Sequence, residues 1–283
     1  MLTVAVAVAL VVAGADRVLP RFSGPLPAGL PQLLRDQELT YPPAERWTFA
    51  VLGDTQWHPE MAALVLAAAQ RDRPSLIFDV GDAVDYGGRR DWEFYLRHVA
   101  AVWDGTPFFQ VPGDHDRGWD GAWWTTATLE RHGGARYRAI NQGSWTILLL
   151  DSSEWQLDGR QREWLAAKLA ELGPQRNLIV LTHMPPADPR TYAHVAHSMG
   201  RVGEAQLAGL LAGYRVRLIV TGHVHVDLAS QWRGIPVLTT AMNYDTWRSP
   251  QDPARWLLFT VRGDEITWQW KALERPAEWE PGS

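Results

Sequence analysis

From residue 47 onward, short apolar runs rich in β-branched residues alternate with longer segments of helical character. The short runs predict strands at residues 48–53, 76–81, 108–112, 144–151, 177–183 and 217–221. The longer segments predict helices at residues 59–71, 91–103, 161–172 and 204–214. Two later runs, 256–262 and 265–270, predict a hairpin that turns at Gly263 and Asp264. This alternation predicts an α/β protein with helices on both faces of its sheet and antiparallel strands added near the end of the chain.

The amino terminus carries an unbroken apolar run over residues 2–15, which ends in the small residues Ala13, Gly14 and Ala15. As a helix this run would reach only about 21 Å, short of the roughly 30 Å hydrocarbon layer of a membrane. Residues 1–15 are therefore predicted to be a signal peptide of a secreted or periplasmic protein, although no Lys or Arg precedes the run. An uncleaved membrane anchor and a buried strand or helix are the alternatives, and no stable membrane span is expected after processing.

Proline is frequent in residues 16–46, where it interrupts helices and sheet ladders. This segment is predicted to be a linker or a wrapping arm. The folded domain is expected over residues 47–275, followed by a short tail at 276–283.

The chain has 283 residues, of which 46% are apolar and 21% charged, the balance of a globular protein with a core. Its net charge is -5 and no stripe of Lys and Arg offsets it, so duplex nucleic acid is not an expected partner. Because there is no cysteine, disulfides and thiolate metal sites are excluded. Any metal must be held by nitrogen and oxygen ligands.

Polar residues stand where the predicted strands end, and in four of five cases a glycine directly precedes them. These residues are Asp54, Asp82, Asp114 and His183, with His223 and His225 after a fifth strand. The carboxyl edge of an open α/β sheet is where ligands bind, and a glycine allows the sharp exit that turns a short side chain toward one point. A single Gly-Asp pair is usually only a turn or a helix cap. Five such strings in one chain predict a common site.

Three carboxylates and three imidazoles are too many ionisable groups to bury together unless cations neutralise them. Two divalent ions about 3.5–4 Å apart can share one carboxylate and one hydroxide, and such a pair promotes in-line displacement at phosphorus. One ion would leave several of these side chains unused. The residues therefore predict two divalent metal ions.

These strings resemble the motifs of the calcineurin-like metallophosphoesterase family over roughly residues 47–245. The family pattern is Asp-x-His, Gly-Asp-x-x-Asp, Gly-Asn-His-Asp/Glu, a lone His and then Gly-His-x-His. The resemblance implies a β-sandwich of two mixed sheets flanked by helices. It also implies that the first metal is bound by Asp54, Asp82 and His225, and the second by Asp82, Asp114, His183 and His223. His115 resembles the catalytic histidine of the family, and Asp85 the acid that orients it.

Two residues depart from the family pattern. Gln56 stands where a metal-binding His is usual, and its amide oxygen could either coordinate the metal or bond to a metal-bound water. Asp114 replaces Asn and adds a negative charge. Both changes make the site richer in oxygen and poorer in nitrogen, so Mn²⁺, Fe²⁺ or Mg²⁺ is expected in preference to Zn²⁺.

Two branches of the family are not expected. Tyr86 stands where the Ser/Thr protein phosphatases have a phosphate-binding Arg, and Asp85 where the purple acid phosphatases have a Tyr ligand. The prediction is a metal-dependent hydrolase of small phosphate esters, either monoesters or diesters, in which hydroxide attacks phosphorus and His115 assists the leaving group. The alternative is a catalytically inactive binding module with the same fold. The sequence does not assign an oligomeric state.

Other side chains could line the substrate pocket or bind phosphate oxygens. Ordinary loop or surface positions are the alternative for each of them. They are His58, His194, His197, Arg89, Arg117 and Arg190.

Overall fold

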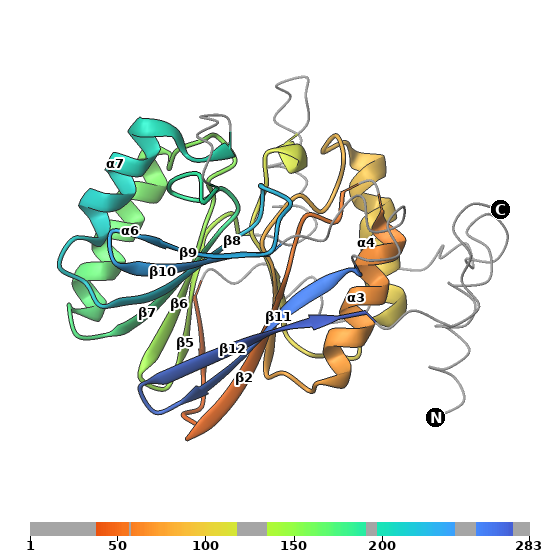
Figure 1. Ribbon diagram of the computed structural model, residues 1–283, viewed down its shortest axis with the longest axis horizontal. Helices are drawn as coiled ribbons and strands as arrows, with labels where there is room; N and C mark the ends of the chain where they lie inside the picture. The colour runs from red at the N-terminus through yellow and green to blue at the C-terminus, as the bar shows by residue number, and fades with distance from the viewer. Residues whose placement is uncertain (1–37, 57, 118–134, 191–196, 241–252, 274–283) are drawn as a thin grey trace, which may run out of the picture.

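The computed structural model describes residues 38–56, 58–117, 135–190, 197–240 and 253–273 (Figure 1). The expected signal peptide, most of the proline-rich segment and the tail at 276–283 lie outside the described residues. The strands form two sheets that lie between two pairs of helices (Figure 1). This arrangement confirms the expected sandwich of two mixed sheets flanked by helices.

The larger sheet has seven strands in the order β1-β5-β6-β7-β8-β10-β9. Their bounds are β1 (Glu38–Tyr41), β5 (Arg138–Gln142), β6 (Trp145–Leu150), β7 (Asn177–Thr182), β8 (Val216–Thr221), β9 (Leu228–Trp232) and β10 (Ile235–Thr239). Strands β6, β7, β8 and β10 are parallel to one another, whereas β5 and β9 are antiparallel to their partners β6 and β10. The carboxyl ends of β7 and β8 therefore lie at the same edge.

The smaller sheet has five strands in the order β12-β11-β2-β3-β4. Their bounds are β2 (Arg46–Leu52), β3 (Leu76–Asp79), β4 (Phe108–Gln110), β11 (Arg255–Arg262) and β12 (Glu265–Ala272). Strands β2, β3 and β4 are parallel, and the predicted hairpin β11–β12 pairs antiparallel with β2.

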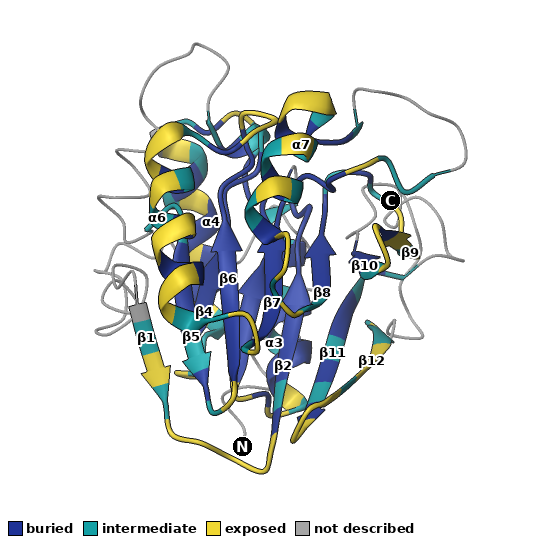
Figure 2. Cartoon of the chain, turned by 90° about the vertical axis from the view of Figure 1, so that its left-hand side faces the viewer, coloured by how far each residue is buried: buried dark blue, intermediate teal, exposed yellow. Residues whose placement is uncertain are grey.

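The helices cover the outer faces of the two sheets. Helices α3 (Pro59–Arg71) and α4 (Arg89–Val102) pack on the smaller sheet, and α6 (Gly159–Leu172) and α7 (Gly200–Leu211) on the larger one. The outward faces of α6 and α7 are exposed while the strands behind them are buried (Figure 2). The short 3₁₀ turn η1 (His115–Arg117) follows β4.

Strand β2 shows how the alternation of side chains builds both apolar layers. Phe49 and Val51 point into the space between the sheets, whereas Ala50 and Leu52 point toward α3 and α4. Between the sheets, Phe49 stacks on Phe259 of β11 with 4.4 Å between ring centroids. Because both faces of β2 are buried, the strand is apolar nearly throughout, as the sequence suggested.

Four strands were not predicted: β1, β5, β9 and β10. Strand β1 lies inside the proline-rich segment and pairs in parallel with β5, and Pro42 and Pro43 follow it directly. The hairpin β9–β10 turns at Arg233 and Gly234, with φ angles of 50° and 80°. Two successive left-handed residues make a tight hairpin turn, but Arg-Gly is not one of the pairs that mark such turns in a sequence.

Helix α7 begins and ends earlier than residues 204–214, where it was predicted. Gly213, with φ of 83°, follows its last turn, and a left-handed glycine at this position is a common helix ending. Among the residues that the structure describes, no helix is both long enough and apolar enough to cross a membrane.

Candidate metal centre

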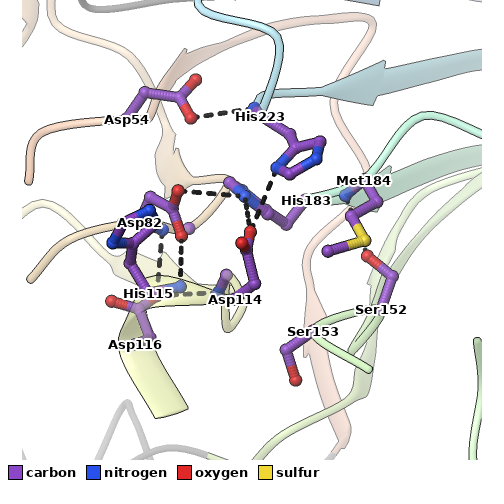
Figure 3. A network of polar contacts seen from close by, with 12 residues as sticks. Asp54, Asp82, Asp114, His115, Asp116, Ser152, Ser153, His183, Met184 and His223 are labelled. Atoms are coloured by element: carbon purple, nitrogen blue, oxygen red, sulfur yellow. Dashed lines mark hydrogen bonds and ion pairs between the residues drawn. The ribbon is translucent and has the colours of Figure 1, made fainter. Parts of the chain in front are cut away.

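Two groups of potential metal ligands form where strands of both sheets end. In each group the ligand atoms lie within 4.8 Å of one another. One group comprises Asp54, Asp82 and His225, and the other comprises Asp82, Asp114, His183 and His223. The side chains of the second group face one another across the edge of the sandwich (Figure 3). The structure thus brings together all six residues expected from the strand ends, and Asp82 belongs to both groups.

The backbone at these residues is unusual. Asp54, Asp82, His223 and His225 have φ angles of 56°, 54°, 71° and 51°. Left-handed conformations are uncommon outside glycine, and strained backbone concentrates at functional sites. The sharp turns that the glycine-containing strings predicted are therefore made largely by the polar residues themselves.

Two of the preceding glycines make room for carboxylates. A Cβ atom at Gly222 would lie 2.7 Å from Oδ2 of Asp54, and one at Gly113 would overlap the carboxylate of Asp82. Any side chain at these positions would push a carboxylate out of place. Close approach, more than left-handed φ, explains glycine at Gly113 and Gly222.

Hydrogen bonds connect the loops that carry these residues. The backbone N–H of His223 donates to Oδ1 of Asp54 (2.8 Å), and the N–H of His115 donates to Oδ1 of Asp82 (3.0 Å). The N–H of Gln56 donates to the backbone oxygen of Asp82 (2.8 Å). Since His223 follows a strand of the larger sheet and Asp54 a strand of the smaller one, the first of these bonds joins the two sheets at the site, and the other two join loops of the smaller sheet.

His183 is fully buried, and its two ring nitrogens face different partners. Nδ1 lies 2.9 Å from the backbone oxygen of Val80, while Nε2 lies 3.0 Å from Oδ1 of Asp114 and 3.3 Å from Oδ2 of Asp82. A histidine that donates Nδ1–H to a backbone carbonyl presents Nε2 to a metal, a common arrangement at metal sites. Burial opposes the charged imidazole, but the charge of Asp82 and bonds to both carboxylates outweigh it and raise the pKa of His183 well above its ordinary value.

The pKa values of Asp114 and Asp54 are shifted in opposite directions because the two carboxylates have different partners. Burial works against ionised Asp114, but hydrogen bonds from His183 and His223, whose Nδ1 lies 3.0 Å away, lower the pKa of Asp114. Burial raises the pKa of Asp54 well above its ordinary value. Oδ2 of Asp54 is buried and has no hydrogen-bond partner in the described part of the chain.

The first group also includes a neutral imidazole. Burial lowers the pKa of His225 to about 4, so this residue is uncharged at neutral pH and able to bind a metal. Together with the unpartnered oxygen of Asp54, this neutral nitrogen fits a cation better than it fits a metal-free core. The donor set contains only nitrogen and oxygen, as the absence of cysteine required.

Gln56 is buried beside the first group. Its Nε2 lies 3.2 Å from Oδ2 of Asp82 and 3.0 Å from Nε2 of His225, and its Oε1 has no partner among the described residues. Rotating the amide by 180° would place Oε1 between Asp82 and His225, where it could contact a cation held by these two residues. The structure brings Gln56 to the cluster, and whether it binds the metal directly stays a prediction.

His115 lies next to Asp82 through its backbone, and its ring is fixed on the other side. Nδ1 of His115 lies 3.0 Å from the backbone oxygen of Asp85. This contact comes from the backbone of Asp85, so an orienting role for its carboxylate stays a prediction. With Nδ1–H donated to a carbonyl, Nε2 of His115 is the nitrogen that can exchange a proton with a substrate.

The other candidates have local partners. Arg117 forms an ion pair with Glu154, and Arg190 binds Asp188 through two nitrogens at 3.0 and 2.8 Å. The ring of His197 lies 5.8 Å from that of His223, measured between centroids.

Of the three remaining candidates, His58 fits the loop and surface interpretation and the other two cannot be placed. Nδ1 of His58 lies 3.3 Å from Glu60, and the His58 side chain does not cap α3. His194 and the side chain of Arg89 lie outside the described part of the chain.

Two buried acids near the site were missed. Asp79 and Asp116 are both fully buried, and neither belongs to a ligand group. Asp116 could have been noticed as the acid that completes the string from Gly113, but nothing in the sequence marks Asp79.

Comparison with known proteins identifies the family. Residues 48–227 match the calcineurin-like phosphoesterase family. The chain belongs to this family. The expected resemblance is thereby confirmed, and so is the prediction of a metal-dependent phosphoesterase.

This calcineurin-like phosphoesterase is similar in sequence to cyclic nucleotide phosphodiesterases and in fold to a dimetal phosphatase. It is 28% identical over 198 residues to the 3′,5′-cyclic adenosine monophosphate phosphodiesterase CpdA of Escherichia coli K12, covering 68% of this chain and 69% of that protein. It is 30% identical over 96 residues to a probable cyclic nucleotide phosphodiesterase of Rhodococcus erythropolis, covering 32% of this chain and 31% of that one. A dimetal phosphatase from Danio rerio has the same fold, with a TM-score of 0.58, 14% identity and coverage of 81% of this chain and 96% of that one.

Proposed function

We propose that this calcineurin-like phosphoesterase hydrolyses a small phosphodiester at a pair of divalent metal ions. The observation that carries the proposal is that Asp82 belongs to both ligand groups, so one carboxylate can serve two cations. The first cation would be held by Asp54, Asp82 and His225, and the second by Asp82, Asp114, His183 and His223. Bound there, the two cations would polarise the phosphate and lower the pKa of an attacking water.

The protein's own groups prepare the reaction. The backbone oxygen of Val80 fixes the ring of His183 so that Nε2 faces Asp82 and Asp114, and loss of the Nε2 proton would free its lone pair for a cation. His115 binds no metal in this proposal. The backbone oxygen of Asp85 accepts from Nδ1–H and so orients the ring, and Nε2 of the protonated imidazolium donates its proton to the departing alkoxide, which leaves the neutral ring. The backbone bond from His115 to Asp82 fixes the distance between the proton donor and the metal ligands.

A diester is the proposed substrate class because the relatives just described include cyclic nucleotide phosphodiesterases. Arg117 and Arg190, two of the candidates for binding phosphate oxygens, are paired with nearby acids. A diester carries one negative charge fewer than a monoester at neutral pH, so it requires fewer cationic side chains.

The proposed metals are Mn²⁺, Fe²⁺ or Mg²⁺ in preference to Zn²⁺. Asp54, Asp82 and Asp114 supply anionic oxygen, and Gln56 could supply a neutral amide oxygen. Oxygen-rich sites suit these harder cations. Metal content after purification from a medium that contains all four metals tests this choice, and a tightly held pair of zinc ions would contradict it.

Export is proposed on the sequence of residues 1–15 alone. Fusion of this segment to a reporter that is active only outside the cytoplasm would test it. The fusion should be active, and a reporter that stays in the cytoplasm would rule export out.

Hydrolysis of bis(p-nitrophenyl) phosphate and p-nitrophenyl phosphate, with Mn²⁺ added, tests the function. The wild type should cleave the diester faster, and Asp82→Asn should lose both bound metal and turnover because both ligand groups lose a charged oxygen. If the wild type binds Mn²⁺ and cleaves neither ester, the chain is a binding module instead. If Asp82→Asn retains turnover, the shared-carboxylate assignment is wrong.

A further inference from the structure

The loop that carries Asp82 has an unusual backbone. The N–H groups of residues 81–84 are four in succession, and every one of them donates to a buried carboxylate. Successive N–H groups that point in one direction form a concave anion site, which in many proteins holds phosphate. Here the anions are side chains of the protein itself, Asp79 and Asp116.

Asp116 accepts three of these bonds and one more from a second loop. Its Oδ1 accepts from Ala83 (2.9 Å) and Val84 (3.1 Å), and its Oδ2 accepts from Asp82 (3.0 Å) and Gly113 (2.7 Å). A carboxylate has about four acceptor positions, so Asp116 is saturated by backbone donors. It therefore has no position left for a metal. Through the Gly113 bond it also joins the loop after β4, which leads to Asp114 and His115, to the loop after β3.

Asp79 completes the set from the other side. Its Oδ1 accepts from the N–H of Gly81 (3.0 Å), and its Oδ2 accepts from the hydroxyl of Tyr95 on α4 (2.7 Å). The ring of Tyr95 packs edge-on against Trp92, 5.9 Å away between centroids. Asp79 thus links the turn before Asp82 to a helix that packs on the outer face of the sheet.

These bonds constrain Asp82, which has a left-handed φ of 54°. Its own N–H and those of both neighbours are held, while its Oδ1 accepts from His115 and its Oδ2 faces His183 and Gln56. We propose that Asp116 and Asp79 are positioning residues that aim the Asp82 carboxylate at both ligand groups and thereby set the affinity of the site for divalent cations. This inference rests on the proposed dinuclear site.

Asparagine variants test the two residues in a graded way. Asn at 116 keeps one accepting oxygen and turns the other into an NH₂ group, so two of four backbone donors lose their acceptor whichever way the amide lies. Asn at 79 can still accept from Gly81 and can donate to the oxygen of Tyr95. Asp116→Asn should therefore have a larger effect than Asp79→Asn, and Tyr95→Phe the smallest effect.

Asp151 offers a matched control. It is a buried carboxylate that follows β6, and it accepts from the N–H of Ser153 (3.0 Å) and pairs with Arg136. Like Asp79, it accepts a hydrogen bond from the backbone of the loop that follows its strand, but it belongs to neither ligand group. Asp151→Asn should lower stability without affecting the metal centre.

The readouts are the Mn²⁺ dissociation constant, measured by calorimetry, and the melting temperature with EDTA and with saturating Mn²⁺. Asp116→Asn should weaken Mn²⁺ binding by about 10–100-fold, the usual effect of losing a group that orients a ligand. The gap between its two melting temperatures should shrink accordingly. Asp151→Asn should lower both melting temperatures together and leave the dissociation constant within about twofold of wild type.

An Asp116→Asn protein that binds Mn²⁺ as tightly as the wild type would overturn the proposal. If that variant does not fold, Asp79→Asn decides: it should weaken binding several-fold, and an affinity equal to that of Asp151→Asn would overturn the proposal. A wild type that binds Mn²⁺ but cleaves neither ester would instead overturn the proposed function, and the dissociation constants would still decide the positioning role.

Discussion

The space between the two sheets and the edge where their strands end contain opposite kinds of residues. Between the sheets, Phe49, Phe78 and Phe259 are completely buried among other apolar side chains, with 4.4 Å between the centroids of the first and last. At the edge, Asp82 and His183 are buried almost as completely, yet both can carry charge. The same strands supply both regions, so position along a strand decides which chemistry a residue serves.

The difference extends to backbone and hydrogen bonding. The interior consists of regular strands, whereas the edge holds four left-handed polar residues and buried polar atoms, such as Oδ2 of Asp54, without a partner in the described part of the chain. Each such feature costs free energy in the metal-free protein. The interior therefore stabilises the fold, and the edge is stable because the interior compensates for it. Cations bound at the edge should remove much of the penalty.

The largest effect on turnover is expected from a substitution that removes the proton donor and leaves the metal ligands in place. His115→Ala should lower kcat on bis(p-nitrophenyl) phosphate by about 10²–10⁴-fold, the usual weight of one acid–base group. Its metal content should equal that of the wild type. His98→Ala is a suitable control, since His98 bonds to the backbone of Phe94 on α4 and belongs to neither ligand group. Equal turnover in His115→Ala and wild type would exclude His115 as the proton donor.

A substitution between the sheets should lower stability and leave metal binding unchanged. Phe49→Ala should lower the free energy of unfolding by about 3–5 kcal/mol, measured by urea denaturation in EDTA, because it leaves a cavity between the sheets. Phe49→Leu should cost much less and remain folded. The folded fraction of either variant should bind Mn²⁺ as the wild type does. Altered affinity per folded molecule would show that the two regions are not separable.

Asp54→Asn should stabilise the metal-free protein. The pKa of Asp54 is raised in the folded state, so ionisation of this carboxyl at neutral pH favours the unfolded protein. Below pH 3.8, the ordinary pKa of Asp, the carboxyl is protonated in the unfolded state as well, and the difference disappears. The variant keeps an oxygen for the His223 N–H. In EDTA at pH 7 it should gain at least about 1 kcal/mol, the equivalent of one pKa unit, and this gain should disappear near pH 3. A lower free energy of unfolding than that of the wild type at pH 7 would contradict the claim that the buried polar residues at this edge destabilise the metal-free protein.

The last prediction is a pH dependence of metal binding. Because the pKa of His183 is raised, this residue holds a proton in the metal-free protein at neutral pH, and a metal must displace it. Mn²⁺ affinity should therefore rise with pH between 6 and 8, by up to about tenfold per unit, with release of protons to the buffer. Calorimetry in buffers of different ionisation enthalpy measures both quantities. Affinity independent of pH would indicate that His183 is not a ligand.

The sequence predicted the site better than it predicted the sheet edges. Asp54, Asp82 and His223 could be found because a strand, a turn and a polar residue follow in a fixed order, and that order alone brings them to one edge. Strands β9 and β10 were missed because their turn at Arg233 and Gly234 uses left-handed residues without the usual sequence pattern.

The parts of the site that could not be predicted depend on backbone partners. Asp79 and Asp116 bind N–H groups that every residue type possesses, so their role leaves no trace in the residues at 81–84. Asp85 was predicted beside His115 for its carboxylate, but the contact between them is made by its backbone oxygen. Residue type reveals side chains that meet one another, and it does not reveal side chains that meet the main chain.

Anomalous diffraction from crystals grown with Mn²⁺ tests the central claim most directly. Two anomalous peaks are predicted, both within bonding distance of Asp82, one also bound by Asp54 and His225 and the other by Asp114, His183 and His223. A single peak, or a pair of peaks that do not share Asp82, would contradict a dinuclear centre built on this carboxylate.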